Sequence, residues 1–214
     1  MGILIKILRV VLIIVLPFFI LIRGSAFIHN RHDLGPWISL GGGAIFTAII
    51  LFLYMTFIYR RFTKKFGDSD NLKRRSLFAL ALVFLYCGYG LFFISSDNFK
   101  NPALKSEISD LHPILRMGVS TFILIDSDMI ITDASRIPED YHIMGLNSAN
   151  NSLHYRQKDG YAYAIDLRTN NRHEFRNKLM QIYFKLLGFN TLRHVGTDDH
   201  LHVSLRCHYR RGAR

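Results

Sequence analysis

The chain has 214 residues, half of them hydrophobic, and carries a formal net charge of +11. The charge is uneven. Residues 1–96 hold 11 Lys and Arg against 3 Asp and Glu, whereas residues 97–214 hold 16 against 13. The positive excess therefore lies in the most apolar part of the chain. This placement argues against nucleic acid as a partner and favours contact with anionic membrane lipid.

Three nearly continuous apolar runs cover residues 3–22, 38–58 and 76–94. A helix needs roughly 20 apolar residues to cross a bilayer, and all three runs have about that length. The alternative for the first run is a cleaved signal peptide, but its apolar stretch is long for one. The sequence therefore predicts a membrane domain over residues 1–96 with three transmembrane helices.

The orientation of these helices follows from the loop at residues 60–75. It carries seven Lys and Arg against only Asp68 and Asp70, whereas the loop at 23–37 carries two Arg. Loops rich in Lys and Arg remain in the cytoplasm. We therefore expect a protein of the cell membrane whose N-terminus is cytoplasmic and whose residues 97–214 are extracytoplasmic.

Residues 97–105 form a predicted polar linker, and residues 106–214 form a predicted small domain. Alternating and helical apolar patterns place its elements. They are a helix over 106–124, a strand over 128–133, a short helix from Ser135, a strand over 161–167, a helix over 174–187, and strands over 191–195 and 201–207. The fold class is therefore α+β, with three N-terminal transmembrane helices before a mainly antiparallel sheet flanked by helices.

The predicted helix over 174–187 is amphipathic. Its apolar stripe, expected to face the core, consists of Phe175, Leu179, Ile182, Tyr183, Leu186 and Leu187. Gly188 follows directly and suits a helix C-cap.

Eight of the ten histidines lie in the outer domain, and His200 and His202 differ from the rest by their spacing. On a strand, residues i and i+2 face the same side, so these two imidazoles are presented together. His154 lies upstream and Asp166 lies on a predicted strand. Two histidines and one carboxylate in this order suit a zinc site that keeps a fourth position open.

Four segments resemble a known family in the same chain order. They are Ser-Leu-His-Tyr at 152–155, Ala-Ile-Asp-Leu-Arg-Thr at 164–169, a helix ending in Leu-Leu-Gly-Phe at 186–189, and Asp-Asp-His-Leu-His-Val-Ser-Leu at 198–205. Together they resemble the zinc-binding fold shared by hedgehog signalling domains and the D-Ala-D-Ala metallopeptidases. The resemblance covers residues 130–206 and leaves out the membrane part.

The resemblance implies that His154, Asp166 and His202 bind Zn2+, with His200 beside the site. It also implies a substrate-binding role for His200 and for Ser152, which stands two residues before the first histidine. Eleven residues separate His154 from Asp166, more than the family usually has. We interpret the excess as an insertion in the turn before the strand, and Asp159 in that turn is the alternative ligand.

The same resemblance assigns the catalytic residues. Asp199 stands three residues before the last zinc histidine, where the peptidases carry the acidic general base, and Asp198 is a second candidate. Arg136 lies where the peptidases carry an Arg that pairs with the substrate carboxylate or polarises the scissile carbonyl. The planar guanidinium fork suits either task.

These features predict a membrane-anchored zinc peptidase that hydrolyses an amide bond in peptidoglycan peptides, similar to D-Ala-D-Ala carboxypeptidases and endopeptidases. No obligate protein partner is evident. One alternative is a non-catalytic zinc-binding module that recognises a partner or a cell-wall ligand. Another makes the membrane helices the functional unit, but these contain few polar residues of the kind that mark intramembrane sites.

Overall fold

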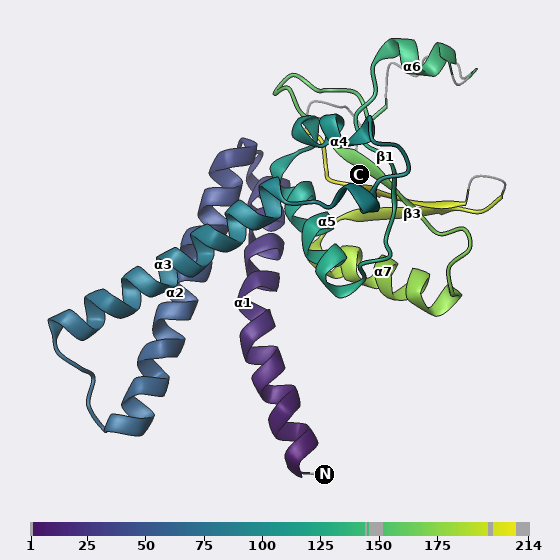
Figure 1. Ribbon diagram of the computed structural model, residues 1–214. Coiled ribbons are helices and arrows are strands. Elements are labelled where there is room, and N and C mark those ends of the chain that lie inside the picture. The colour runs from purple at the N-terminus through teal and green to yellow at the C-terminus, as the bar shows by residue number, and fades with distance from the viewer. Residues whose placement is uncertain (1, 144, 146–151, 197–198, 209–214) are drawn as a thin grey trace.

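The computed structural model describes residues 2–143, 145, 152–196 and 199–208. Three long helices form one part of the molecule, and a small α+β domain sits at one end of them (Figure 1). The long helices are α1 (Gly2–His32), α2 (Pro36–Thr63) and α3 (Ser69–Phe92).

Two of these helices, α2 and α3, are long and apolar enough to cross a membrane. Few of their residues are buried, and large apolar side chains such as Phe57 and Phe84 are exposed. The sequence predicted three such helices, but only two are found among the described residues. The first predicted span, at 3–22, lies in α1, and the side chains of residues 3–14 fall outside the described part of the chain.

Helices α1 and α2 pack closely because Gly43 lies against the backbone of α1. A Cβ added at Gly43 would lie 2.7 Å from the carbonyl oxygen of Leu21 and 2.9 Å from the backbone nitrogen of Ser25. The Ser25 hydroxyl turns back onto the Leu21 carbonyl at 2.7 Å, so this buried hydroxyl is paired at the contact. Small residues allow such close approach between membrane helices.

The described residues of the small α+β domain, called the outer domain after its predicted location, form four strands and several helices. Its elements are η1 (Ser96–Asn98), α4 (Leu104–Glu107), η2 (Ile108–Asp110), α5 (Pro113–Ile125), β1 (Ile131–Asp133), α6 (Pro138–Ile143), β2 (Ala164–Arg168), α7 (Glu174–Leu187), β3 (Asn190–His194) and β4 (His200–Ser204). The strands form one antiparallel sheet in the order β1-β2-β4-β3. The predicted α+β class with an antiparallel sheet is therefore confirmed.

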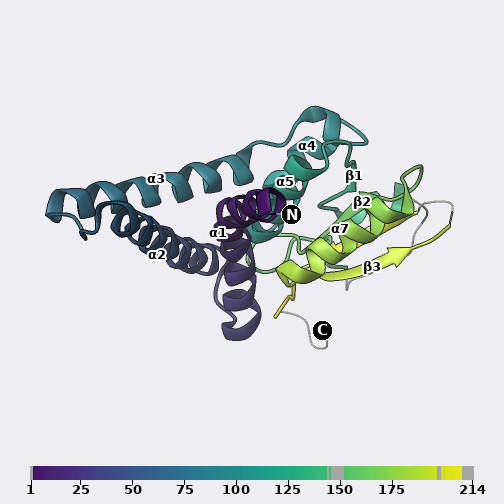
Figure 2. The same cartoon turned by 90° about the horizontal axis from the view of Figure 1, so that it is seen from below.

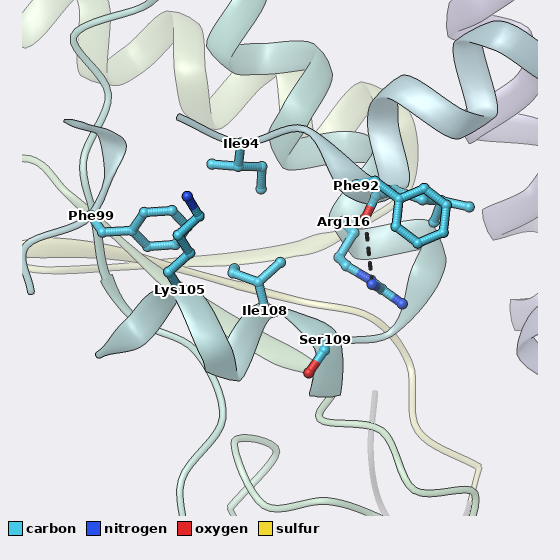
Figure 3. A pocket seen from close by; sticks show the side chains of 8 residues that line it. Phe92, Ile94, Phe99, Lys105, Ile108, Ser109 and Arg116 are labelled. Carbon is cyan, nitrogen blue, oxygen red and sulfur yellow. Dashed lines mark hydrogen bonds between the residues drawn. The ribbon is translucent and has the colours of Figure 1, made fainter. Parts of the chain in front are cut away.

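The outer domain is fixed to the end of α3. The Ser120 hydroxyl of α5 donates to the Gly90 carbonyl at 2.8 Å, and Arg116 donates to the Leu91 carbonyl at 3.4 Å. A cavity of about 170 Å³ lies at this junction, and Figure 3 shows Lys105 and Arg116 among its lining side chains. In the segment predicted as a linker, Asn98 is buried and its amide donates to two backbone carbonyls. The domain thus packs directly on the long helices.

The predicted helix over 106–124 is divided in the structure. The continuous helix α5 begins only at Pro113, which occupies its first turn, and His112 caps it by accepting a hydrogen bond from the Ile114 backbone nitrogen. Proline suits the first turn because its missing N–H needs no partner there. The predicted strand over 128–133 is likewise reduced to the three residues of β1.

Helix α7 has the predicted bounds, and Gly188 caps it with a left-handed φ of 94°. Its buried face, however, differs from the predicted stripe and consists of Asn177, Met180, Phe184 and Leu187. Phe184 packs between the rings of Phe122 and Phe189, and these contacts select the face that turns inward. Only Leu187 belongs to both sets, and Phe175, Leu179, Ile182 and Leu186 are exposed.

The two faces of the sheet have different neighbours. Arg193 of β3 bonds Glu174 of α7, so α7 covers the face on which Arg193 lies. Asp166, Leu192 and His202 stand in register on adjacent strands, so they share the opposite face.

Candidate metal centre

Three side chains from separate segments converge on the sheet face opposite α7. Asp166 lies in the middle of β2, His202 lies opposite it on β4, and His154 comes from the loop before β2. Their ligand atoms all lie within 4.8 Å of one another. His154 and Asp166 are buried, whereas His202 is partly exposed. These three residues could hold a metal ion, as the sequence predicted.

The orientation of His154 is fixed by its backbone surroundings. Its Nδ1 lies 2.8 Å from the Ala134 carbonyl oxygen, and a carbonyl can only accept, so Nδ1 carries the proton. Nε2 then faces Asp166 and His202, at 3.5 Å and 3.4 Å respectively. A carbonyl that holds the far nitrogen of a histidine is a typical second-shell feature of metal sites.

Asp166 is the centre of the cluster. Its Oδ1 lies 2.8 Å from His202 Nδ1, and its Oδ2 lies 3.6 Å from Arg136 and 3.7 Å from His200 Nε2. Burial by itself raises the pKa of Asp166, but hydrogen bonds from His154 and His202 outweigh it and hold that pKa well below its usual range. The carboxylate is therefore ionised at neutral pH, as a metal ligand must be.

Arg136 lies at the edge of the same cluster. Its guanidinium is paired with Asp133 through two contacts and also faces Asp166. Its backbone N–H donates to the His154 carbonyl at 3.0 Å, which ties the two segments together. The predicted substrate arginine is thus beside the candidate ligands.

His200 also lies beside the cluster, as predicted, with its side chain about a quarter exposed. The sequence analysis missed His194, whose ring stacks on His200 at 4.7 Å between centroids. Both residues occupy paired positions on β3 and β4, so His194 extends the row of imidazoles on this face. The strand pattern alone did not reveal this pairing, because it depends on the register between strands.

Ser152 and Asp159 occupy local structural roles. The Ser152 hydroxyl accepts a hydrogen bond from the backbone nitrogen of His154 at 3.2 Å. The Asp159 carboxylate accepts hydrogen bonds from the Tyr163 hydroxyl at 2.6 Å and the Tyr161 backbone at 3.2 Å. Asp159 therefore holds its own turn, and Asp166 supplies the carboxylate of the cluster.

The carboxylate of Asp199 is bound by Arg193 and Thr169. Its two carboxylate oxygens accept hydrogen bonds from Arg193 at 3.0 and 2.9 Å, and Oδ1 also accepts from the Thr169 hydroxyl at 2.7 Å. The hydrogen bonds from Arg193 lower the pKa of Asp199 to about 2. Asp198, the second candidate base, lies outside the described residues.

A further carboxyl group close to the site is Glu107, which the sequence analysis did not assign to it. Burial together with the nearby charges of Asp133 and Asp140 raises the pKa of Glu107 to about 7. One of its oxygens is buried without a hydrogen-bond partner among the described residues. Glu107 is linked to the site through the charge of Asp133, which pairs with Arg136, and through a hydrogen bond with the Ser135 backbone.

The donor set of two imidazoles and one carboxylate is typical of zinc sites that leave one coordination position open. The arrangement also suits a metal, because Nε2 of His154 faces the cluster and Asp166 is ionised. Comparisons with protein-family models, with curated proteins and with solved structures found no match.

Proposed function

We propose that this protein is a membrane-anchored, zinc-dependent peptidase that hydrolyses an amide bond in peptidoglycan peptides. The observation that carries the proposal is the convergence of His154, Asp166 and His202 within 4.8 Å from three separate segments. A chance grouping of buried ionisable side chains is uncommon, because each buried polar group must be paired or bind a ligand.

Each residue of the site has its own role in the proposed reaction. Zinc, when bound, would act as a Lewis acid and lower the pKa of an attacking water. Arg136, held by Asp133, offers its guanidinium to the substrate carboxylate or the scissile carbonyl oxygen. His200 contacts the substrate at the open side, and Ser152 keeps the loop that carries His154 in place.

Asp199 is the proposed general base. It would accept a proton from the attacking water and return it to the leaving amine. For this it must release Arg193 and Thr169, which hold it in the present structure. We propose that substrate binding breaks this clamp.

The membrane location agrees with the substrate class. With the basic loop at residues 60–75 in the cytoplasm, the outer domain would lie outside the membrane, where peptidoglycan is found. Because the domain packs directly on α3, its reach is short, which favours membrane-proximal wall or precursor peptides as substrates.

A second candidate function is a non-catalytic zinc module that binds a partner or a cell-wall ligand. One observation favours it, namely that Arg193 occupies the carboxylate of Asp199, the first candidate base. The metal would then have a structural role and the exposed histidines would form a binding surface.

Zinc analysis of the full chain combined with digestion of purified muropeptides separates these two functions. The peptidase proposal expects one zinc per chain and release of an amino acid or a shorter peptide. Stoichiometric zinc with no cleavage of a broad muropeptide panel would leave the binding module as the function.

A further inference from the structure

Helix α7 has an outward face that is as apolar as its buried face. Four large side chains form this face at helical spacing: Phe175, Leu179, Ile182 and Leu186. Their exposed fractions are 62%, 47%, 52% and 59%. Water-soluble domains rarely leave such a contiguous apolar stripe uncovered, so this face is expected to contact a partner.

The position of α7 indicates what that partner is. Figure 1 shows α7 on the side of the outer domain from which α1 descends, and Figure 2, seen from below, shows it in front of the strands. Since its buried face packs on the domain core, its apolar stripe faces the side on which the long helices extend.

The C-terminal end of α7 is fixed to α1 at a defined level. The Asn30 amide donates to the Gly188 carbonyl at 3.3 Å, and the Arg23 guanidinium lies against Gly188. Arg23 directly follows the apolar run at residues 3–22. The end of an apolar run marks the membrane surface, so the C-terminal end of α7 lies near that surface.

The charges beside the stripe fit a lipid surface. Lys178 and Lys185 are exposed and stand three residues from Phe175 and Ile182, so they flank the apolar stripe. Lysine side chains in such positions can extend to anionic headgroups while their stems remain in apolar surroundings. A helix with an apolar stripe and flanking lysines is typical of interfacial helices.

We propose that α7 lies in the outer surface of the membrane, with Phe175, Leu179, Ile182 and Leu186 inserted among the headgroups and upper acyl chains. Interfacial helices are buried about 5–10 Å in this region. The sheet face that carries Asp166 and His202 is opposite α7, so the candidate metal centre faces away from the membrane. The inference rests on the membrane anchoring within the proposed function and is independent of zinc chemistry.

Tryptophan fluorescence in nanodiscs tests this placement with the full chain. In a Trp37→Phe background, which removes the single native tryptophan, one tryptophan is introduced at a time. Ile182→Trp probes the outward face of α7, Phe84→Trp probes an exposed position of α3, and Leu192→Trp probes the exposed metal-side face of the sheet. The probe lipid is an anionic phospholipid mixture brominated on the upper part of the acyl chain.

We expect brominated lipid to quench the tryptophans at positions 182 and 84 and to leave the one at 192 unchanged. Quenching at 84 without quenching at 182 would overturn the placement of α7 alone. Absence of quenching at both positions would overturn the membrane anchoring as well. A third outcome is that the chain dimerises and the tryptophan at position 182 is quenched neither by brominated lipid nor by aqueous acrylamide. The stripe would then be an interface between two copies, which also overturns the proposal.

Discussion

Asp166 and His202 stand directly opposite each other on β2 and β4, with Asp166 Oδ1 2.8 Å from His202 Nδ1. The hydrogen-bonded ladder of these strands sets this distance, so two of the three candidate ligands are held together by the sheet itself. The third, His154, belongs to a loop and depends on the Ala134 carbonyl for its orientation. The strand ladder therefore fixes two of the three candidate ligands, and the Ala134 carbonyl orients the third.

Substitution His202→Ala should remove zinc from the protein. It deletes one of three donors, and metal bound to the folded state contributes to folding free energy, so the melting temperature in the presence of zinc should fall as well. Metal analysis after dialysis and a zinc titration of the melting temperature measure both effects. The control His142→Ala, an exposed histidine in α6, should retain zinc. Equal zinc content in the two variants would contradict the assignment of the ligands.

Substitution Asp199→Asn should leave zinc bound and abolish most muropeptide hydrolysis. Removal of a general base typically costs about 10²–10⁴ in rate. The matched control is Glu174→Gln, which removes the other carboxylate partner of Arg193 without touching Asp199. Hydrolysis by Asp199→Asn at the rate of the parent protein would show that a different group is the base.

Substitution Glu107→Gln should stabilise the protein at alkaline pH and have no effect in acid. The pKa of Glu107 in the folded state, about 7, lies above its ordinary value of 4.5. The folded state therefore holds the proton more tightly, and the ionised carboxylate destabilises it increasingly as pH rises from about 4.5 through 7.

Melting temperatures of the parent and Glu107→Gln proteins at pH 4.5 and pH 8 measure this difference. We expect the variant to melt a few degrees higher at pH 8, since about 1 kcal/mol corresponds to roughly 2–4 °C in a chain of this size. Glu139→Gln, an exposed glutamate of α6, is the control and should show no such pH dependence. A parallel shift at both pH values would indicate a packing effect instead of an ionisation effect.

Substitution Gly43→Ala should disrupt the packing of α1 against α2. The added methyl group would meet the backbone of Leu21 and Ser25, neither of which can move without displacing α1. Overpacking of this kind costs about 1–3 kcal/mol. The control Gly41→Ala lies on the same helix, where a Cβ meets nothing within 4 Å, and should be neutral. Melting temperatures in detergent compare the two variants.

Replacement of the seven Lys and Arg between residues 60 and 75 by Gln should disturb the membrane orientation. These charges are the strongest topological signal in the chain. A C-terminal reporter that is active only outside the cytoplasm should report activity in the parent protein and lose it in part in the variant. Activity of a cytoplasm-specific reporter at the C-terminus of the parent protein would contradict the predicted orientation.

Some features could be predicted from the sequence because they depend on residues that are neighbours in the chain. Helix α7 has its predicted bounds, since the glycine that ends it is adjacent in the chain and adopts the left-handed conformation expected of it. The family resemblance indicated His154, Asp166 and His202 as ligands, and strand alternation added only that His200 and His202 share a face. Even the choice of Asp166 over Asp159 depended mainly on where a turn gives way to a strand.

Other features were decided only when distant segments met. The inward face of α7 was predicted wrongly, because both of its faces are apolar and only the aromatic contacts of Phe184 with Phe122 and Phe189 select one. The partner of Asp199 is Arg193 on the neighbouring strand, and His194 reaches His200 through strand register. Local patterns determine which elements form and which side chains they can present together. The packing between elements determines which of these side chains are buried, paired or left free, because that outcome depends on neighbours far away in the chain.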